Sequence, residues 1–565
     1  MAKINPFQGG DGIGKRLLDG GFVNSEQVEA AREVALSSSK ELVDVLLEQG
    51  LISIETLASI LSLEFNVPAV NLASIEVQTE AIAMIPAHIA REQRILPISV
   101  EGNILTIAME NPGDLQVISS LSSLTRKQVK AVVPVGMKLN DAIDRYYRLI
   151  GEIEQQLSQV VGVKTAKETT EASADLVKEA PVVQAVDMLL TQAVRDRASD
   201  IHIEPQKDYL RIRFRIDGVL HESLKLPQGV HSAILTRIKV MAGLNIAERR
   251  RPQDGQFSVT VNNKPIDCRV ACIEGDYGEM AVIRILDKSV LLLKPSDLGM
   301  YPSTLQPFEK LLGSAFGMIL VSGPTGSGKT TTLYAALSQL NASEVNIMTI
   351  EDPIEYRFDK INQIQCNRLA GITFAVGLRA IMRLDPDIIL VGEIRDKETA
   401  TTAVQAALTG HLVLSSIHAN DSISAVIRLI DMGVEPFLVT SAVLGSLSQR
   451  LVRRVCRSCS TTSEASPAAA MAYQAEMKEE RRDFLYGHGC NFCTRTGYLG
   501  RVGAFELLTL SDPIRRLLTK GASASEIKAV AMQEGMVGIR HDGMQKAKDS
   551  LVTPEEVLHN VFTIL

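Results

Sequence analysis

One octapeptide in the middle of the chain has the residue types and spacing of a phosphate-binding loop. An apolar segment at 317–322 leads directly into Gly-Pro-Thr-Gly-Ser-Gly-Lys-Thr at 323–330, which satisfies the pattern GxxxxGK[ST]. Glycines let the backbone wrap phosphate oxygens, Lys329 can reach the β and γ phosphates, and the Thr330 hydroxyl can ligate Mg²⁺. A helix indicated at 331–340 disfavours a chance match. The residues predicted to bind ATP are Gly323, Pro324, Thr325, Gly326, Ser327, Gly328, Lys329, Thr330 and Thr331.

Acidic residues follow two further apolar segments that we predict to be strands. They are Glu351, Asp352 and Glu355 after the segment at 346–350, and Glu393 at the end of the segment at 387–393. A buried strand that ends in a carboxylate can hold Mg²⁺ or its water beside a phosphate-binding loop, as in a Walker B element. Glu351 and Asp352 could instead begin a helix.

Two histidines, His411 and His418, flank a third predicted strand at 412–417. An imidazole at the end of such a strand could sense the γ-phosphate of a bound nucleotide. The alternative for both is a structural histidine whose ring nitrogens are satisfied by nearby polar groups.

Four of the seven cysteines form two CxxC pairs, Cys456 with Cys459 and Cys490 with Cys493, separated by residues 460–489. Two such pairs can supply four thiolates to tetrahedral Zn²⁺, and the metal would then close the insertion at 456–493. The odd total favours a reducing compartment over a disulfide framework. Reduced metal-free thiols or a redox pair remain the alternative. We expect the Ala-, Glu- and Lys-rich middle of the insertion to be a solvated helix.

The composition limits which classes of protein these sites can belong to. The chain has 565 residues, enough for about three to five domains, with 45% hydrophobic, 22% charged and 4% aromatic residues and no Trp. Its 59 basic and 66 acidic residues give a net charge of −7, which as a whole attracts neither nucleic acid nor anionic lipid. We therefore expect no nucleic-acid partner, and the lack of an aromatic-basic stacking strip disfavours a helicase.

The apolar segments are too short to cross a bilayer, which takes roughly 18 to 20 residues. The first 14 residues carry Gly and Asp where a secretory signal would be apolar. We therefore expect a cytoplasmic protein whose membrane association is indirect.

The pattern along the chain predicts an α/β protein of several parts. A segment at 21–28 is echoed 29 positions later at 50–57, and in each copy a Gly ends one helical pattern before Ser or Asn offers an N-cap. No aromatic residue occurs between Tyr147 and Tyr209. Within this stretch, residues 151–180 are rich in Glu, Lys, Ser, Thr and Gln. The predicted parts are an N-terminal helical repeat module at 1–66, a small α/β domain at 67–150, a linker at 151–180, a second α/β domain at 181–290, and a nucleotide-binding core at 291–565.

The order of motifs from 181 to 565 resembles the secretion ATPase superfamily, specifically type IV pilus assembly and type II secretion ATPases. The resemblance rests on the segments at 199–205 and 248–255, the phosphate-binding loop, the acidic box at 351–355, the segment at 378–395 and the histidine box at 410–418. It implies a RecA-like P-loop ATPase core that works as a homohexamer, in which the domain at 181–290 closes on bound ATP.

The resemblance also implies roles for individual residues. Glu393 would coordinate Mg²⁺ or water and Glu355 would polarise the attacking water, although these two roles could be exchanged. Arg269 and Arg284 match positions from which arginines reach the γ-phosphate and offset developing charge; a solvated strand face is their alternative. With His418, these residues make up the predicted catalytic set. The run of arginines at 249–251 is either a solvated surface or a phosphate or subunit contact.

The tetracysteine insertion is common in assembly and export ATPases of this superfamily and generally lacking in the related retraction ATPases. The resemblance therefore implies a motor that powers assembly of a type IV pilus or a type II secretion pseudopilus, at the inner face of the cytoplasmic membrane. Its partners would be an inner-membrane platform protein and cytoplasmic docking proteins. A nucleotide-regulated scaffold with little turnover is the alternative.

The N-terminal repeat resembles the superfamily's cyclic-di-GMP-binding module, but the residues that would carry that function differ. Gly12 and Glu41 stand at the apparent arginine positions, and Ala35 and Glu64 at the apparent glutamine positions. The basic groups that would pair with the dinucleotide phosphates are missing. This favours a partner-docking domain over cyclic-di-GMP binding.

Overall fold

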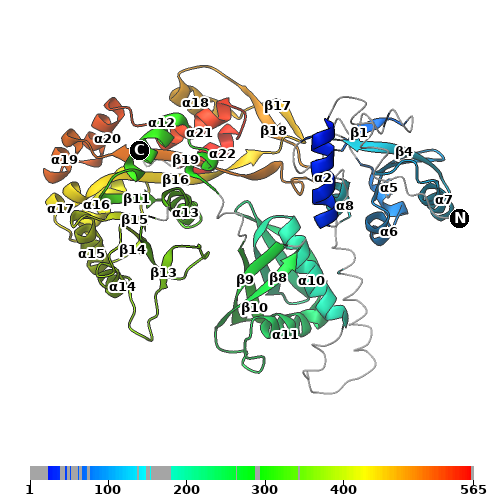
Figure 1. Ribbon diagram of the computed structural model, residues 1–565, viewed down its shortest axis with the longest axis horizontal. Helices are drawn as coiled ribbons and strands as arrows, with labels where there is room; N and C mark the ends of the chain where they lie inside the picture. Colours follow the sequence, from blue (N-terminus) through cyan, green and yellow to red (C-terminus); the bar gives the residue numbers. More distant parts are fainter. Residues whose placement is uncertain are drawn as a thin grey trace. The chain divides into compact units, whose positions relative to one another are not determined.

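The protein is described by a computed structural model that separates into two compact units, Met1–Gly151 and Glu152–Leu565 (Figure 1). The structure describes residues 23–38, 67–147 and 180–561, apart from 73–74, 76, 136–138, 262–263, 287–292, 342–343 and 491, and a few isolated positions at 45–46, 51–52, 62 and 153. Most of the predicted repeat module, including Gly12, Glu41 and Glu64, and nearly all of the predicted linker lie outside the described residues.

The first unit contains helix α2 and a small mixed sheet covered by short helices. The sheet order is β1-β4-β3-β2, with β1 and β3 parallel to β4 and β2 antiparallel to β3. Its apolar residues form one buried cluster with the helices. The elements are α2 (Ser25–Ser38), β1 (Ala69–Asn71), α5 (Thr79–Met84), α6 (Ala87–Glu92), β2 (Ile95–Glu101), β3 (Ile104–Met109), α7 (Leu115–Thr125), β4 (Gln128–Val135) and α8 (Leu139–Tyr146).

The second unit begins with an antiparallel sheet in the order β7-β6-β5-β10-β9-β8, packed against α10 and α11. Buried and partly exposed residues alternate along β6, as expected where one face of a sheet covers a core. The elements are α10 (Ala180–Arg195), β5 (Ala198–Pro205), β6 (Tyr209–Ile216), β7 (Val219–Pro227), η2 (Gln228–Val230), α11 (His231–Met241), β8 (Gln253–Val261), β9 (Lys264–Gly275) and β10 (Gly278–Leu286). This part corresponds to the predicted second α/β domain at 181–290, and from here on the name small α/β domain refers to it and not to the segment at 67–150.

The core that follows is a larger sheet in the order β13-β12-β14-β15-β11-β16-β19, parallel except for the antiparallel pair β16 and β19. Strands β11, β12 and β15 are buried along their whole length, which explains their uninterrupted apolar sequences. The elements are η4 (Pro295–Leu298), α12 (Pro302–Leu312), β11 (Gly317–Ser322), α13 (Lys329–Leu340), β12 (Ile347–Glu351), β13 (Asn362–Gln365), α14 (Phe374–Ile381), β14 (Ile388–Ile394), α15 (Lys397–Leu408), β15 (Leu412–Ile417), α16 (Ser422–Asp431), α17 (Pro436–Ala442), β16 (Val443–Val455) and β19 (Tyr498–Thr509).

The insertion between β16 and β19 is part of the fold rather than a solvated appendage. It contains a two-stranded antiparallel sheet of β17 (Ser460–Glu464) and β18 (Asp483–Gly487), with helix α18 (Pro467–Met477) between the two strands in the chain. The expected solvated helix is therefore half right, since Ala469 and Tyr473 are buried against C-terminal helices. The helices that contact α18 are α21 (Ile539–Lys548) and α22 (Pro554–Asn560). Two further helices, α19 (Asp512–Thr519) and α20 (Ala524–Gln533), precede them and pack on the core.

The three sheets confirm the α/β class, while the exact domain boundaries remain predictions. Among the described helices, none combines the length and the apolar character that a membrane span requires.

A buried ion pair fastens α21 to the core sheet. The Lys546 ammonium donates to Asp542, both side chains are almost fully buried, and Asp542 also accepts the Phe505 N–H at 2.9 Å. Lys546 further lies 4.5 Å from the ring centroid of Tyr301.

Replacing Asp542 with Ala should lower the free energy of unfolding of the core by about 3–5 kcal/mol, because it leaves a buried ammonium unpaired. Urea unfolding followed by circular dichroism measures this loss. Lys528→Ala, at an exposed position of α20, is the control and should stay within about 0.5 kcal/mol. A double change of Asp542→Leu with Lys546→Met should cost less than Asp542→Ala alone. If the double variant lost as much free energy of unfolding as Asp542→Ala, or if Asp542→Ala lost no more than the control, the pair would not be a buried-charge contact.

Candidate functional site

The predicted phosphate-binding loop lies between the end of β11 and the start of α13. Gly323 and Gly328 have φ of +149° and +89°, which side chains rarely adopt. A Cβ on Gly323 would lie 2.5 Å from Ser327 Oγ and 2.6 Å from the Gln449 carbonyl. The glycines therefore let the loop fold tightly against the neighbouring strand and start a helix whose N-terminal N–H groups face the loop.

Gln449 of β16 fastens this loop, and nothing in the sequence singled it out. Its amide donates to the Ser327 carbonyl at 2.7 Å and accepts from the Thr332 hydroxyl at 2.7 Å. The side chain is buried, and β16 runs parallel to β11. One amide thus joins the loop, the first turn of α13 and the adjacent strand. A Gln that follows Ser in a strand has no distinctive local signal, because its partners lie 117 or more residues away.

Lys329 points into the loop. Its ammonium donates to the carbonyls of Gly323 at 2.8 Å and Pro324 at 3.0 Å. Burial lowers the pKa of Lys329 to about 8, against the nearby Glu393 carboxylate, which raises it. Thr330 is exposed beside it and Thr331 half-buried, so the hydroxyl that would ligate Mg²⁺ is accessible.

Glu393 and His418 come together at the carboxyl ends of neighbouring strands. Glu393 lies near the end of β14 and His418 directly follows β15; His418 Nε2 is 3.6 Å from Glu393 Oε2. Arg395 pairs with the other Glu393 oxygen. Burial and then the charge of Lys329 lower the pKa of His418, which favours the neutral imidazole. A carboxylate and a hydroxyl are ligands that Mg²⁺ prefers, so Glu393 and Thr330 fit that ion by the chemistry of their donors.

Glu355 meets an arginine from the small α/β domain. Arg269 of β9 donates to Glu355 Oε2 at 2.7 Å and also to the Ile354 carbonyl. Arg284 lies directly opposite Arg269 on β10, but it pairs with Asp200 of β5 at 3.1 Å and is 61% exposed. The structure therefore brings Arg269, and not Arg284, to the acidic box.

Other candidates have different surroundings. Glu351 ends β12 and does not start a helix; it is buried and accepts from Tyr334, Thr349 and Gln363, so it organises the core. His411 lies at the opposite end of β15 from His418, with its ring against the Ala406 carbonyl. The arginines at 249–251 are exposed.

A cavity of about 350 Å³ adjoins the phosphate-binding loop. One wall is the turn after β6, at 217–219, and the other is the loop itself; Arg450, Arg453 and Arg501 contribute cations to its lining. Arg453 is held by Glu556 at 2.7 Å and lies 4.1 Å from the ring centroid of Tyr498. The cavity is thus bounded by the phosphate-binding loop and by the small α/β domain.

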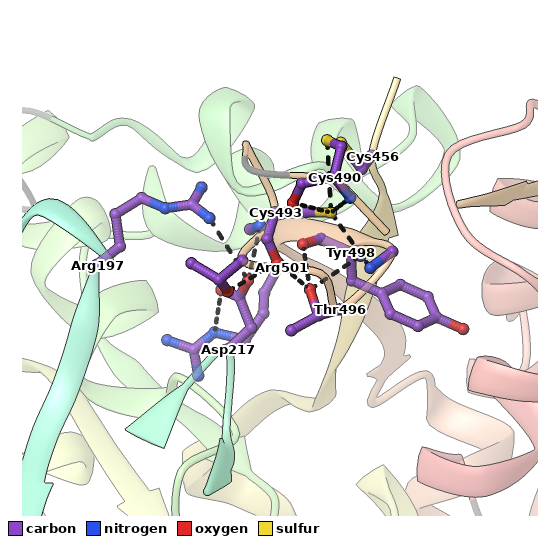
Figure 2. A network of polar contacts seen from close by, with 11 residues as sticks. Arg197, Asp217, Cys456, Cys490, Cys493, Thr496, Tyr498 and Arg501 are labelled. Carbon is purple, nitrogen blue, oxygen red and sulfur yellow. Dashed lines mark hydrogen bonds and ion pairs between the residues drawn. The ribbon is translucent and has the colours of Figure 1, made fainter. Parts of the chain in front are cut away.

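The four cysteines of the two CxxC pairs converge on one point. Figure 2 labels three of them, Cys456, Cys490 and Cys493. Their sulfurs all lie within 4.8 Å of one another, with 3.8 Å between Cys456 and Cys490, 3.8 Å between Cys459 and Cys493, and 3.7 Å between Cys490 and Cys493. Tetrahedral Zn²⁺ with Zn–S bonds of about 2.3 Å places its sulfurs about 3.8 Å apart, so the donor set fits this metal. Hydrogen bonds from Cys456 and from backbone N–H groups lower the pKa of Cys493, which favours a thiolate.

This fold and site define a RecA-like P-loop core with an accessory cysteine cluster. The family model described as "Type II/IV secretion system protein" matches residues 175–559, and the chain belongs to this family. A model described as "MshEN domain" matches residues 65–152.

Individual related proteins and a solved structure agree with this family assignment. The type IV pilus assembly ATPase PilB of Myxococcus xanthus is 40% identical over 556 residues, 97% of this chain and 98% of that protein. The type II secretion system protein E of Xanthomonas campestris pv. campestris is 38% identical over 554 residues, 96% of each chain. The solved structure of the Legionella pneumophila ATPase DotB has 20% identity and a TM-score of 0.50, and covers 70% of this chain and 97% of its own. The last likeness supports the fold.

The affinity of the protein for ADP should fall roughly tenfold per pH unit above about pH 8. Phosphate binding favours the charged form of Lys329, so this attraction is complete below the pKa of the free protein and is lost as pH rises through it. Titration with a fluorescent nucleotide between pH 6.5 and 9.5 measures the effect. Lys329→Arg stays charged over this range and should bind with a flat profile. A flat profile for the wild type would refute the assignment.

The folded protein should hold about one zinc ion per chain, and Cys493→Ser should lose most of it because three thiolates remain. Metal analysis of the dialysed protein measures this. Cys366→Ser removes a thiol outside the cluster and should keep the metal. Well-folded wild type without zinc would count against the site.

Proposed function

We propose that the protein is an ATPase motor that powers assembly of a type IV pilus or of a type II secretion pseudopilus. The observation that carries the proposal is the bridge between two domains at one nucleotide site: Arg269 of the small α/β domain contacts Glu355 of the core, while Lys329 and Glu393 lie at the phosphate-binding loop. Domain movement and phosphate chemistry therefore involve the same side chains. Relatives of nearly the same length include a pilus assembly ATPase and a type II secretion protein.

Each residue has a role in this proposal. Lys329 and the loop N–H groups hold the phosphates, and Thr330 and Glu393 hold Mg²⁺, which would neutralise charge on the phosphates. Glu355 or Glu393 orients the attacking water. His418, which lies close to Glu393, senses the γ-phosphate. Arg269 offsets the charge that develops during phosphoryl transfer. Arg284, which pairs with Asp200 in this structure, would support it from the neighbouring strand once that ion pair opens.

The ion pair of Arg269 suggests how hydrolysis and movement are coupled. While Arg269 is paired with Glu355 at 2.7 Å, its guanidinium occupies a carboxylate oxygen that would otherwise be available to an attacking water. A γ-phosphate that attracts Arg269 would free Glu355, so the same movement that completes the phosphate site would activate the acid. Loss of the γ-phosphate reverses both changes.

The chain's membership of the family supports a proposal for its assembly and partners. We propose a homohexamer bound to an inner-membrane platform protein and to cytoplasmic docking proteins, with membrane association through these partners. The MshEN match at 65–152 begins after the repeated segments at 21–28 and 50–57. We retain a partner-docking role for the N-terminal region, which direct titration with cyclic-di-GMP would test.

Glu393→Gln should reduce steady-state ATP hydrolysis by about a hundredfold or more while leaving nucleotide affinity within a few-fold, because it removes a charge needed in the transition state. Phosphate release by the magnesium-supplied assembled protein measures turnover. Glu344→Gln, at an exposed position between α13 and β12, is the matched control.

Turnover by Glu393→Gln at the wild-type rate would refute the role of this acid. Wild type that binds ATP but scarcely hydrolyses it would support the scaffold instead, and wild type that does neither would overturn the function.

A further inference from the structure

Asp217 occupies the turn at which the small α/β domain touches the core. Strand β6 ends at Ile216 and β7 begins at Val219, so Asp217 and Gly218 form a two-residue hairpin turn with φ of +49° and +90°. Asp-Gly is a favoured sequence for such turns. The turn is held from its own domain, since Arg215 donates to the Gly218 carbonyl at 2.9 Å. The Asp217 carboxylate is therefore presented on a rigid support.

The carboxylate meets the core at the start of β19. Asp217 Oδ2 accepts the Gly500 N–H at 2.9 Å, and Arg501 Nε lies 4.0 Å from Oδ1 (Figure 2). The guanidinium of Arg197, which belongs to the small α/β domain itself, lies 3.9 Å from Asp217 Oδ2. The Asp217 side chain is only 12% exposed, so solvent screens these contacts weakly.

A bulge presents the Gly500 N–H to Asp217. On β16 one residue separates Arg453 from Val455, whereas their partners Arg501 and Tyr498 on β19 are separated by two. Gly500 is one of the two residues that separate Tyr498 from Arg501, and it has φ of +79°. Bulges turn backbone groups out of the regular ladder, and glycine tolerates the required conformation.

The same segment is hydrogen-bonded to the cysteine cluster. The Gly497 N–H donates to Cys493 Sγ at 3.3 Å, and the Cys456 N–H donates to the Gly497 carbonyl at 3.0 Å. The Thr496 hydroxyl donates to the Tyr498 carbonyl at 2.9 Å. From the cluster to Gly500, the backbone is thus held by short contacts over a few residues (Figure 2).

The Asp217 turn also lines the cavity beside the phosphate-binding loop, with Pro324 and Thr325 on the facing wall. Anything that shifts the turn changes the width of this space. A contact that fixes the turn on the core would therefore position one wall of the nucleotide site.

We propose that Asp217 is a positioning residue that docks the small α/β domain onto the segment after the cysteine cluster, and so links metal occupancy of the cluster to nucleotide binding. The proposal rests on the proposed function only in taking the loop and its cavity as the nucleotide site. Because such a link is reciprocal in affinity, bound nucleotide raises the affinity of the cluster for zinc by the factor by which the metal raises the affinity for nucleotide. We expect this gain to appear as slower release of the metal.

The experiment compares wild type, Asp217→Ala and Asp217→Asn in the full-length, zinc-loaded protein. Asp208→Ala, at an exposed position in the turn at the other end of β6, removes a carboxylate of the same domain that lies away from the contact and serves as the matched control. One readout is the Kd of fluorescent ADP, and the other is the rate at which zinc passes to a chromogenic chelator with and without ADP.

We expect Asp217→Ala to weaken ADP binding by roughly fivefold or more and to abolish the slowing of zinc release by ADP. Asp217→Asn keeps an acceptor for the Gly500 N–H but no charge, so it should show part of both effects. Asp208→Ala should match the wild type. If Asp217→Ala misfolds by circular dichroism, both readouts are taken from Asp217→Asn.

The outcomes separate this proposal from the function on which it rests. Wild type that binds no nucleotide would overturn the proposed function. Wild type that binds ADP, with the same Kd and the same response of zinc release in the Asp217 variants, would overturn the docking role alone. Weaker ADP binding with an unchanged zinc response would refute the link between the two sites.

Discussion

The hydrogen bonds of the Gln449 amide are the constraint on which the site depends. A phosphate-binding loop works only if its N–H groups converge on one point, and glycines alone cannot enforce this because they adopt many conformations. The buried amide fixes the loop by donating to Ser327 and accepting from Thr332. Since Gln449 lies on β16, which pairs with β11, the loop is held on both sides by the core sheet. The glycines, which are flexible by themselves, are thereby held in one conformation.

Around this fixed loop, the charges divide into a core set and an interdomain set. Lys329, Glu393, Arg395 and His418 all belong to the core and lie at neighbouring strand ends. Arg269 and Asp217, by contrast, reach the core from two different parts of the small α/β domain. The first set resembles a preformed phosphate site. In the proposed function, the second set is the one that would be made and broken if the domain moved, which is the division that an enzyme needs if chemistry is to drive movement.

The sequence predicts best what is decided locally. The predicted strands at 317–322 and 412–417 match β11 and β15, because each is a buried apolar run bounded by glycine or histidine. The loop motif and the paired cysteines were equally visible, since their chemistry fixes their spacing. The RecA-like class followed from the order of these motifs and is confirmed.

Prediction failed where a residue depends on a distant partner. Asp217 and Gly500 are 283 positions apart, and nothing local distinguishes that aspartate from other hairpin turns. Arg284 matches a family position and its assigned role stays a prediction, but sequence reasoning missed its ion pair with Asp200, 84 positions away. The burial of one face of α18 was missed for the same reason: its Ala-rich sequence has no strong apolar stripe, and its contacts come from helices near the C-terminus.

Strand β16 carries two of these features on one backbone. Gln449 lies in its middle, and Cys456 directly follows its last residue, Val455. Because side chains alternate between the two faces of a strand, a slip of one residue would turn the amide away from the loop and shift the cysteine from its three partners. An insertion or deletion in this strand before Gln449 would therefore disturb the phosphate-binding loop and the cysteine cluster together, although no residue of either had been altered.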